Sequence, residues 1–384
     1  MISFKKTEEQ ELLLESLKDF VERYCPEESV KAWYTAHDVP DEIAKEFVNA
    51  GFGFLGIPEE YGGTPCDVLT LMMVAEELCR LTASTMPFLS NILNMYDMVL
   101  LGTPEQIKTT MKEYEENGKP SFSLAISEPQ AGSDNSSMST TARHVDGKVI
   151  INGSKTFVTH GDVAPYTLVV CKEEEPSREN KEMSMYMVPL NSKGISTSKL
   201  HKIGQNVTSF CEMYFDNVEC DESCLVGERG KGFVQLMDNF AIERLLICAQ
   251  ALGLAQAAMD DAAAYAAQRV QFEQPIYKFQ QIQEKLTDME AKLVNMRNMV
   301  YMVAWQHDNG ESTRITAALA KRYVCTAATE VCSDAVQILG GIGYTTETRV
   351  SRAWLDSRGW QIAGGTNEVM VHVAGRQLIK KYGK

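Results

Sequence analysis

The hydrophobic period of this chain changes twice along its length, and that change limits the folds it can adopt. In the first part, apolar side chains recur every three or four residues, as in TEEQELLLESLKDFVERY, where Thr7 and Gln10 also match a capping box. In the middle, the period becomes two, in runs such as KVIINGSKTFVTH and YTLVVCK. After Gly232 the helical period returns. This order predicts an α+β chain in which a small sheet domain separates two helical ones.

The same changes of period predict the domain boundaries. We expect an N-terminal helical domain over 1–120, a β-sheet domain over 121–230 and a C-terminal helical bundle over 231–384. A long bundle helix is expected around 286–303, because six apolar residues there alternate at spacings of three and four. These residues are Leu286, Met289, Leu293, Met296, Val300 and Val303.

Two dipeptides and one charged segment predict the connections within the sheet domain. Asp146-Gly147 and Asn152-Gly153 favour the positive φ angles of tight turns between strands. The segment KEEEPSRENKE, residues 172–182, is polar and highly charged, which predicts a solvated loop.

Charge and cysteine content argue against several classes of function. Among 384 residues, 37 Lys plus Arg stand against 52 Asp plus Glu, and the net charge of −15 disfavours nucleic acids and anionic membranes as partners. The start, MISFKKTEEQ, turns acidic before any apolar run, and no stretch approaches transmembrane length, so we expect neither secretion nor membrane insertion. The ten cysteines and six histidines lack metal-ligand spacing. We therefore expect a cytoplasmic protein with reduced thiols and no metal site.

The short sequence SEPQAGSD, at 127–134, is the first candidate for a ligand site. It follows a β-rich run, its small residues let a ligand approach the backbone, and Ser127 and Ser133 offer hydroxyls. Taken alone, it would more often be an ordinary turn. It resembles, however, the TEPGAGSD signature of the acyl-CoA dehydrogenase family. Further motifs of that family occur in family order over nearly the whole chain, namely PEEYGG, NGSKTFVT, VGERGKGF, QRVQF, QILGGIGY and GGTNE.

The resemblance implies a FAD cofactor and residues that bind it. In the sheet domain these are Leu124, Ile126, Ser127, Gly132, Ser133, Phe157 and Thr159, with Ser133 also near CoA and Thr159 donating toward flavin N5. In the helical bundle they are Arg269, Phe272 and Gln280, which would reach the FAD of a neighbouring subunit, and Gln337, Gly340, Gly341, Thr366 and Glu368. Thr366 and Asn367 also resemble caps of the last helix. Without the resemblance, Thr159 would be an ordinary strand residue, Arg269 a helix-end cation and the glycines a helix C-cap.

The sequence QIAGGTNEV, at 361–369, raises the question of where a catalytic base lies. In the family, the position of Gly364 usually holds a glutamate that removes the α proton of an acyl thioester, which glycine cannot do. A branch that resembles isovaleryl-CoA and long-chain dehydrogenases places this glutamate on a helix before an arginine, which corresponds here to Glu243 and Arg244. The apolar run after Glu243 independently predicts a desolvated carboxylate with a raised pKa. The alternative is a glutamate paired with Arg244.

Under this hypothesis, Gly364 keeps a role through its backbone. The resemblance implies that its amide and a ribityl hydroxyl of FAD bind the thioester oxygen, and that Arg244 contacts the substrate. We expect an acyl-CoA dehydrogenase in which Glu243 takes the α proton and a hydride passes from the β carbon to flavin N5. The reverse reaction, reduction of an enoyl-CoA, is also expected, because DAAAYAAQRVQF, IQEKL and VAGRQLIKKY resemble the branch of crotonobetainyl-CoA reductase.

Partners and rival functions follow from the same resemblance. It implies electron-transferring flavoprotein as the redox partner and a homotetramer as the assembly. The alternatives are a non-catalytic scaffold that binds flavin or acyl-CoA, and an acyl-CoA oxidase. The sequence does not identify the acyl group of the substrate.

Overall fold

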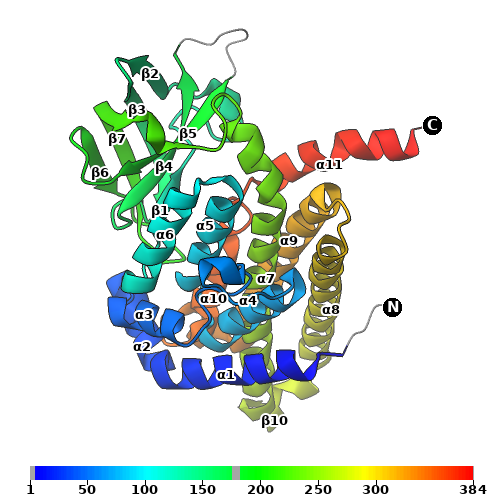
Figure 1. The fold of residues 1–384 in the computed structure, drawn as a ribbon. Coiled ribbons are helices and arrows are strands. Elements are labelled where there is room, and N and C mark those ends of the chain that lie inside the picture. Colours follow the sequence, from blue (N-terminus) through cyan, green and yellow to red (C-terminus); the bar gives the residue numbers. More distant parts are fainter. Residues whose placement is uncertain (1–4, 175–181, 384) are drawn as a thin grey trace.

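The structure, a computed structural model, describes residues 5–174 and 182–383 and confirms the predicted α+β fold (Figure 1). The N-terminal part contains α1 (Glu8–Tyr24), α2 (Glu27–Ala36), α3 (Asp41–Asn49), η1 (Glu59–Tyr61), α4 (Val68–Thr82), α5 (Phe88–Leu101) and α6 (Pro104–Asn117). The middle part contains β1 (Phe122–Ala125), η2 (Asn135–Ser137), β2 (Thr141–Val145), β3 (Lys148–Thr159), β4 (Tyr166–Glu173), β5 (Met183–Pro189), β6 (Ile195–Lys199), β7 (Phe210–Asp221), η3 (Glu222–Cys224) and β8 (Leu225–Val226). The C-terminal part contains α7 (Gly232–Gln268), β9 (Val270–Gln271), β10 (Gln274–Pro275), η4 (Ile276–Lys278), α8 (Gln280–Asp308), α9 (Arg314–Leu339), η5 (Gly340–Tyr344), α10 (Arg349–Gly359) and α11 (Asn367–Tyr382).

The first helix begins where its capping signal predicts. The Gln10 amide donates to Oγ1 of Thr7 at 3.2 Å, and the Thr7 amide donates to Oε1 of Gln10 at 3.0 Å. Two of the four unsatisfied amides of the helix start are paired in this way, which is the predicted capping box. The same arrangement of Thr103 and Gln106 begins α6.

The largest core lies among α4, α7, α8, α9 and α10. The predicted apolar stripe on α8 is confirmed. Leu286 is partly buried, and the other members of the stripe are fully buried, namely Met289, Leu293, Met296, Val300 and Val303. Small residues on α7 and α9, such as Ala251 and Ala328, are also fully buried. In Figure 1, α7 starts beside the sheet and runs through the middle of the helical parts, so this one helix connects the sheet to the helical core.

One feature of α7 differs from expectation. We predicted no stretch of transmembrane length, yet in the described part of the chain α7 is long and apolar enough by length and composition. However, 78% of its most apolar window is buried inside the protein. This burial explains the composition, because a helix surrounded by other helices is apolar on all sides.

The sheet is built around β4, and this arrangement positions the SEPQAGSD loop. β5 pairs antiparallel with one edge of β4, while β1 and β2 pair parallel with successive parts of the other edge. The strand order is β6-β7-β3-β2-β4-β5-β8, with β1 beside β4. The chain between β1 and β2 must therefore leave the sheet and return to it. One face of β4 packs through Leu168 and Val170 against side chains of α5 and α6, and the other face forms a separate core.

Of the two predicted turns, one is confirmed and one is wrong. Asp146 and Gly147 have φ angles of 50° and 76° and connect β2 to β3. Asn152 and Gly153 instead lie inside β3, at a register shift opposite β7. A Cβ on Gly153 would overlap Thr140, so the glycine permits a β-bulge in a tightly packed strand. Most of the predicted loop 172–182 lies outside the described residues.

Candidate active site

The loop between β1 and β2 is fixed by a buried ion pair. Nζ of Lys155, on β3, lies 2.9 Å from Oε1 of Glu128 and 2.9 Å from the carbonyl oxygen of Ile126, and both charged side chains are fully buried. Glu128 also accepts hydrogen bonds from the amides of Ser139 at 2.6 Å and Thr140 at 2.9 Å. Burial alone would raise the pKa of Glu128, but the hydrogen bonds outweigh it and lower the pKa to about 2. Sequence analysis did not single out this pair, although both residues belong to its motifs.

The predicted flavin residues of the sheet domain are exposed or only partly buried. Gly132, Ser133, Phe157 and Thr159 are exposed, while Leu124, Ile126 and Ser127 are partly buried. Phe157 is 62% exposed because a register shift in β3 and a positive φ of 59° turn it out of the sheet, where it stacks on Phe210. An exposed aromatic ring beside hydroxyl groups provides a surface that a planar, polar ring system can cover.

Glu243 lies on α7, next to the turn that contains Gly364. A Cβ built on Gly364 would lie 3.8 Å from Oε1 of Glu243, so the two positions face the same space. Within the described residues, the carboxylate makes no hydrogen bond and no ion pair, with Arg244 or any other cation. Burial raises the pKa of Glu243, and the nearby charges of Arg244 and Lys321 oppose the rise. The structure therefore contradicts the alternative of a paired glutamate.

The turn at Gly364 and Gly365 joins α10 to α11. Both residues have positive φ, 64° and 88°, which favours glycine. A Cβ on Gly364 would also overlap Cδ1 of Ile247, which lies one turn after Glu243 on α7. In the part of the chain that the structure describes, the N–H of Gly364 donates to no acceptor. A free backbone donor thus lies beside a free carboxylate.

The start of α11 agrees only in part with its predicted caps. The amide of Val369 donates to Oγ1 of Thr366 at 3.2 Å, so Thr366 caps the helix. Asn367 does not act as a cap, because it is the first residue of the helix and donates to Oγ1 of Thr326 at 2.9 Å. Glu368 is exposed in the first turn.

Arg244 is buried and forms no ion pair with an anion in the described part of the chain. Its side chain lies over the ring of Phe240, with Cζ 5.7 Å from the ring centre, and the residue is only 6% exposed. Nε is shielded from solvent and has no hydrogen-bond acceptor among the described residues. Burial lowers the pKa of Arg244, and Glu243 opposes that shift. An anionic or carbonyl group of a ligand would satisfy these donors.

A second buried carboxyl group, which sequence analysis missed, lies near Glu243. Asp97 on α5 accepts a hydrogen bond from Nδ2 of Asn239, which precedes Glu243 by one turn of α7. Burial raises the pKa of Asp97 to about 7, the hydrogen bond opposes the rise, and the charge of Glu243 adds to it. The spacing of Asn239 and Glu243 places both on one face of a helix, which is the only sequence signal for this arrangement.

Arg269, Phe272 and Gln280 lie far from Glu243 in the same chain. They are all exposed, around the β9–β10 hairpin at the far end of α7 (Figure 1). At 1.5 Å per residue, α7 spans roughly 39 Å between Glu243 and Arg269. Phe272 and Glu273 form the hairpin turn with positive φ angles of 49° and 64°, a geometry that glycine adopts more readily than glutamate. A single chain does not bring these residues to the Glu243 site.

The predicted QxxGG residues form the end of α9. Gly340 follows the helix with a φ of 68°, and its N–H donates to the carbonyl oxygens of Val336 and Gln337. A helix C-cap is therefore part of its role. Gln337, Gly340 and Gly341 are all exposed, and a Cβ on either glycine would meet open space. A ligand can approach this backbone without obstruction.

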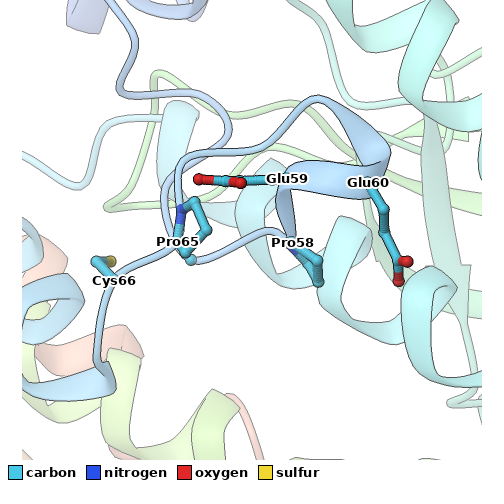
Figure 2. A pocket seen from close by; sticks show the side chains of 6 residues that line it. Pro58, Glu59, Glu60, Pro65 and Cys66 are labelled. Atoms are coloured by element: carbon cyan, nitrogen blue, oxygen red, sulfur yellow. The ribbon is translucent and has the colours of Figure 1, made fainter.

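A surface pocket of about 430 Å³ lies elsewhere, in the N-terminal part (Figure 2). It is lined by Gly56, Pro58, Glu59, Glu60, Pro65 and Cys66, so it includes the start of the PEEYGG motif. None of the predicted site residues lines it. Gly63 at the end of the motif is required for packing, because a Cβ there would overlap the backbone of Ile57. The motif therefore shapes a local loop.

Comparisons with known proteins agree with this architecture over the whole chain. Three family models match it: the acyl-CoA dehydrogenase N-terminal domain over 7–114, the middle domain over 123–218 and the C-terminal domain over 230–379. The chain is 45% identical over 381 residues, 99% of both proteins, to the “Probable acyl-CoA dehydrogenase YdiO” of Escherichia coli strain K12.

Two solved structures are similar along their full length. An acyl-CoA dehydrogenase from Slackia heliotrinireducens is 39% identical, with a TM-score of 0.88 over 100% of this chain and 99% of that one. A butyryl-CoA dehydrogenase from Megasphaera elsdenii is 32% identical, with a TM-score of 0.91 over 98% and 100%. The chain belongs to the acyl-CoA dehydrogenase family.

Proposed function

We propose that this protein is a FAD-dependent oxidoreductase in which Glu243 moves the α proton of an acyl-CoA thioester. One observation supports this role above the others: Glu243 is a partly buried carboxylate that, within the described residues, accepts no hydrogen bond and faces the turn at Gly364. Buried carboxylates in folded proteins are normally paired. An unpaired one beside a free backbone donor has the properties of a general base next to the group it helps to activate.

The residues around Glu243 suggest how the thioester would be held. The free N–H of Gly364 can donate to the thioester oxygen and stabilise the negative charge that develops when the α proton leaves. Arg244 can donate to a polar or anionic group of the CoA arm, which would satisfy its buried guanidinium. Burial raises the pKa of Glu243, so the carboxylate becomes a stronger base than an exposed glutamate. This arrangement corresponds to the branch with its base on the helix of the C-terminal part.

The sheet domain has donors and surfaces that suit a flavin. Phe157 and Thr159 would lie against the ring system, and Ser127 and Ser133 would donate hydroxyl groups from the loop that Glu128 and Lys155 fix. When bound, FAD supplies the acceptor for the hydride from the β carbon. Arg269, Phe272 and Gln280 would bind the FAD of a neighbouring subunit, which accords with a homotetramer. Further FAD contacts would come from the end of α9 and the start of α11, through Gln337, Gly340, Gly341, Thr366 and Glu368.

The direction of the reaction and the redox partner are further parts of this proposal. Family members act on acyl-CoA, form oligomers and couple to electron-transferring flavoprotein. We propose electron-transferring flavoprotein as the partner here, and reduction of an enoyl-CoA of the crotonobetainyl-CoA type as a second physiological direction. The reverse reaction needs no other residue, because Glu243 would then return a proton to the α carbon. All ten cysteines are free, which suits the reducing cytoplasm.

Anaerobic spectroscopy of the purified holoprotein tests this function. A panel of straight and branched saturated acyl-CoAs is added to the oxidised protein, and the matching enoyl-CoAs, including crotonyl-CoA and crotonobetainyl-CoA, are added to the reduced protein. We expect at least one acyl-CoA to bleach the flavin absorbance, or its enoyl-CoA to restore it. A colourless protein, or a yellow one that responds to no member of either panel, would favour a non-catalytic scaffold.

A further inference from the structure

A second buried lysine, Lys321 on α9, lies behind the turn at Gly364 and Gly365. Its side chain is fully buried, and Nζ donates to the carbonyl oxygen of Gly365. Within the described residues it makes no ion pair within 4 Å, whereas Lys155, also fully buried, is paired with Glu128. Lysine is almost never fully buried without a partner. The packing of α9 alone gives no reason for a charged residue at this position.

The charged and titratable groups around Lys321 come mainly from α7. Burial lowers the pKa of Lys321, Arg244 adds to this, and the charge of Glu243 opposes it. Two thiols, Cys248 on α7 and Cys325 on α9, also face Lys321. Burial raises the pKa of Cys248 well above its ordinary value, so this thiol stays protonated. Glu243 is thus the carboxylate that interacts with Lys321, although the two do not touch.

The turn that Lys321 contacts has little stiffness of its own. Glycine has more backbone freedom than any other residue, and Gly364 and Gly365 both adopt positive φ angles. Contacts from outside the turn must therefore fix its geometry. The hydrogen bond from Lys321 fixes the carbonyl of Gly365. Further along, Nη1 of Arg322 donates to the Asn367 carbonyl at 3.2 Å. The donor of the first contact is a fully buried residue, whereas the donor of the second, Arg322, is an exposed one.

We propose that Lys321 is a positioning residue of the site: it fixes the glycine turn so that the N–H of Gly364 faces the substrate, and together with Arg244 it supplies positive charge that favours the anionic form of Glu243. This inference rests on the proposed function of Glu243. Lys321 acts through the turn and through the electric field, and it does not touch the reacting atoms. In the low dielectric of the protein interior, a cation that does not pair directly still favours the ionised carboxylate.

Two variants separate the two parts of this role. Lys321→Gln keeps a hydrogen-bond donor for Gly365 and removes the charge, while Lys321→Met removes both. Arg322→Gln is the matched control, because it changes the neighbouring, exposed residue and its hydrogen bond to the Asn367 carbonyl. For each holoprotein, the ionisation of Glu243 is followed by infrared spectroscopy across a pH series, through the carboxyl stretch that disappears in Glu243→Gln.

We expect both Lys321 variants to raise the ionisation midpoint of Glu243 by about one pH unit or more, a tenfold change in its proton affinity. The pH optimum of flavin bleaching by the best acyl-CoA of the panel should move up with it. Lys321→Met should also lose more of its maximal rate than Lys321→Gln, because methionine cannot donate a hydrogen bond to the Gly365 carbonyl. Arg322→Gln should leave the midpoint within about 0.3 unit of the wild type.

A folded Lys321→Gln or Lys321→Met protein with an unchanged midpoint would overturn the inference. If Lys321→Met does not fold, Lys321→Gln alone decides the charge effect. The infrared titration needs no substrate, so it remains informative when no acyl-CoA is active. Retained turnover in Glu243→Gln would instead refute the proposed function, and the two failures can be told apart.

Discussion

The sheet and the helical bundle each contain a glutamate that interacts with a buried lysine, and the two pairs behave in opposite ways. In the sheet, Glu128 and Lys155 are in direct contact, and hydrogen bonds hold the pKa of Glu128 at about 2 against the effect of burial. In the bundle, Glu243 and Lys321 are apart, no donor among the residues that the structure describes reaches Glu243, and burial raises its pKa. Residue types are the same in both places, although Glu128 is fully buried and Glu243 only partly buried. The number of hydrogen-bond donors separates a structural carboxylate from one that can take a proton.

This difference also predicts that the two pairs will tolerate substitution differently. Removing one member of a buried, satisfied pair leaves an uncompensated charge, and the whole cost falls on folding. Removing Glu243 breaks no hydrogen bond, so its cost should fall on chemistry. Stability measurements and activity measurements can therefore test the two halves of the comparison separately.

The largest effect on stability is expected for Lys155→Met. This change leaves Glu128 charged, buried and without its cation, and should lower the free energy of unfolding by about 3–5 kcal/mol. Urea denaturation of the holoprotein at pH 7 measures it. Lys148→Met is the control, because Lys148 lies on the same strand and its ion pair with Asp221 is exposed. Equal stability of the two variants would show that the buried pair does not hold the loop.

A smaller effect is expected from acid. The pKa of Glu128 in the folded protein is below its ordinary value, so its contribution to stability is present above pH 4.5 and is lost as the pH falls toward about 2. Urea denaturation of the wild type between pH 5 and pH 2 should therefore show falling stability, as far as the protein stays folded. The slope should be shallower in Glu128→Gln. Parallel curves for both proteins would contradict the assignment.

The opposite sign is expected for Asp97. Its pKa in the folded protein is raised from 3.8 to about 7, so the protonated form is favoured and stability is lost as the pH rises through this range. In Asp97→Asn this loss should disappear. The variant should gain stability relative to the wild type between pH 4 and pH 8, as measured by urea denaturation. A difference that does not change with pH would show that Asp97 is ionised throughout.

The smallest effect is a partial rescue of activity. Gly364→Glu in a Glu243→Gly background moves a carboxylate to the opposite side of the same space. The backbone of the new glutamate must keep a positive φ, at a cost of about 1–2 kcal/mol, and its Cβ overlaps Ile247. Adding Ile247→Val, which removes Cδ1, should therefore improve the rescue. Flavin bleaching should recover to a small fraction of the wild-type rate, and less without Ile247→Val.

Sequence patterns predicted the fold well, because the helical and strand periods are local properties. The capping box at Thr7 and the apolar stripe on α8 needed only neighbours along the chain. The turn predicted at Asn152-Gly153 failed, because a glycine in a bulge and a glycine in a turn have the same local signal, and only the contact with Thr140 distinguishes them. The wrong cap at Asn367 has a similar origin, since its partner Thr326 lies on another helix.

The candidate site was predictable only in part. Family motifs named Glu243 and Gly364, and the apolar run on α7 supported a buried carboxylate. Asp97, Lys155 and Lys321 were not identified, because each acquires its meaning from a partner distant in sequence. Whether Glu243 was paired also could not be decided from sequence. Pairing depends on side-chain direction across helices, which no local pattern encodes.

The most direct test of the central claim compares two isosteric changes at glutamates of the helical domains, one unpaired and one paired. Glu243→Gln is compared with Glu76→Gln, since Glu76 is paired with Arg297 and Tyr301 between α4 and α8. The measurement is the anaerobic rate of flavin bleaching by the best acyl-CoA of the panel, with the bound FAD quantified in each protein. We expect Glu243→Gln to keep its FAD and lose about 10²–10⁴-fold in rate, while Glu76→Gln loses stability and keeps its rate. A rate for Glu243→Gln within about tenfold of the wild type would contradict the account.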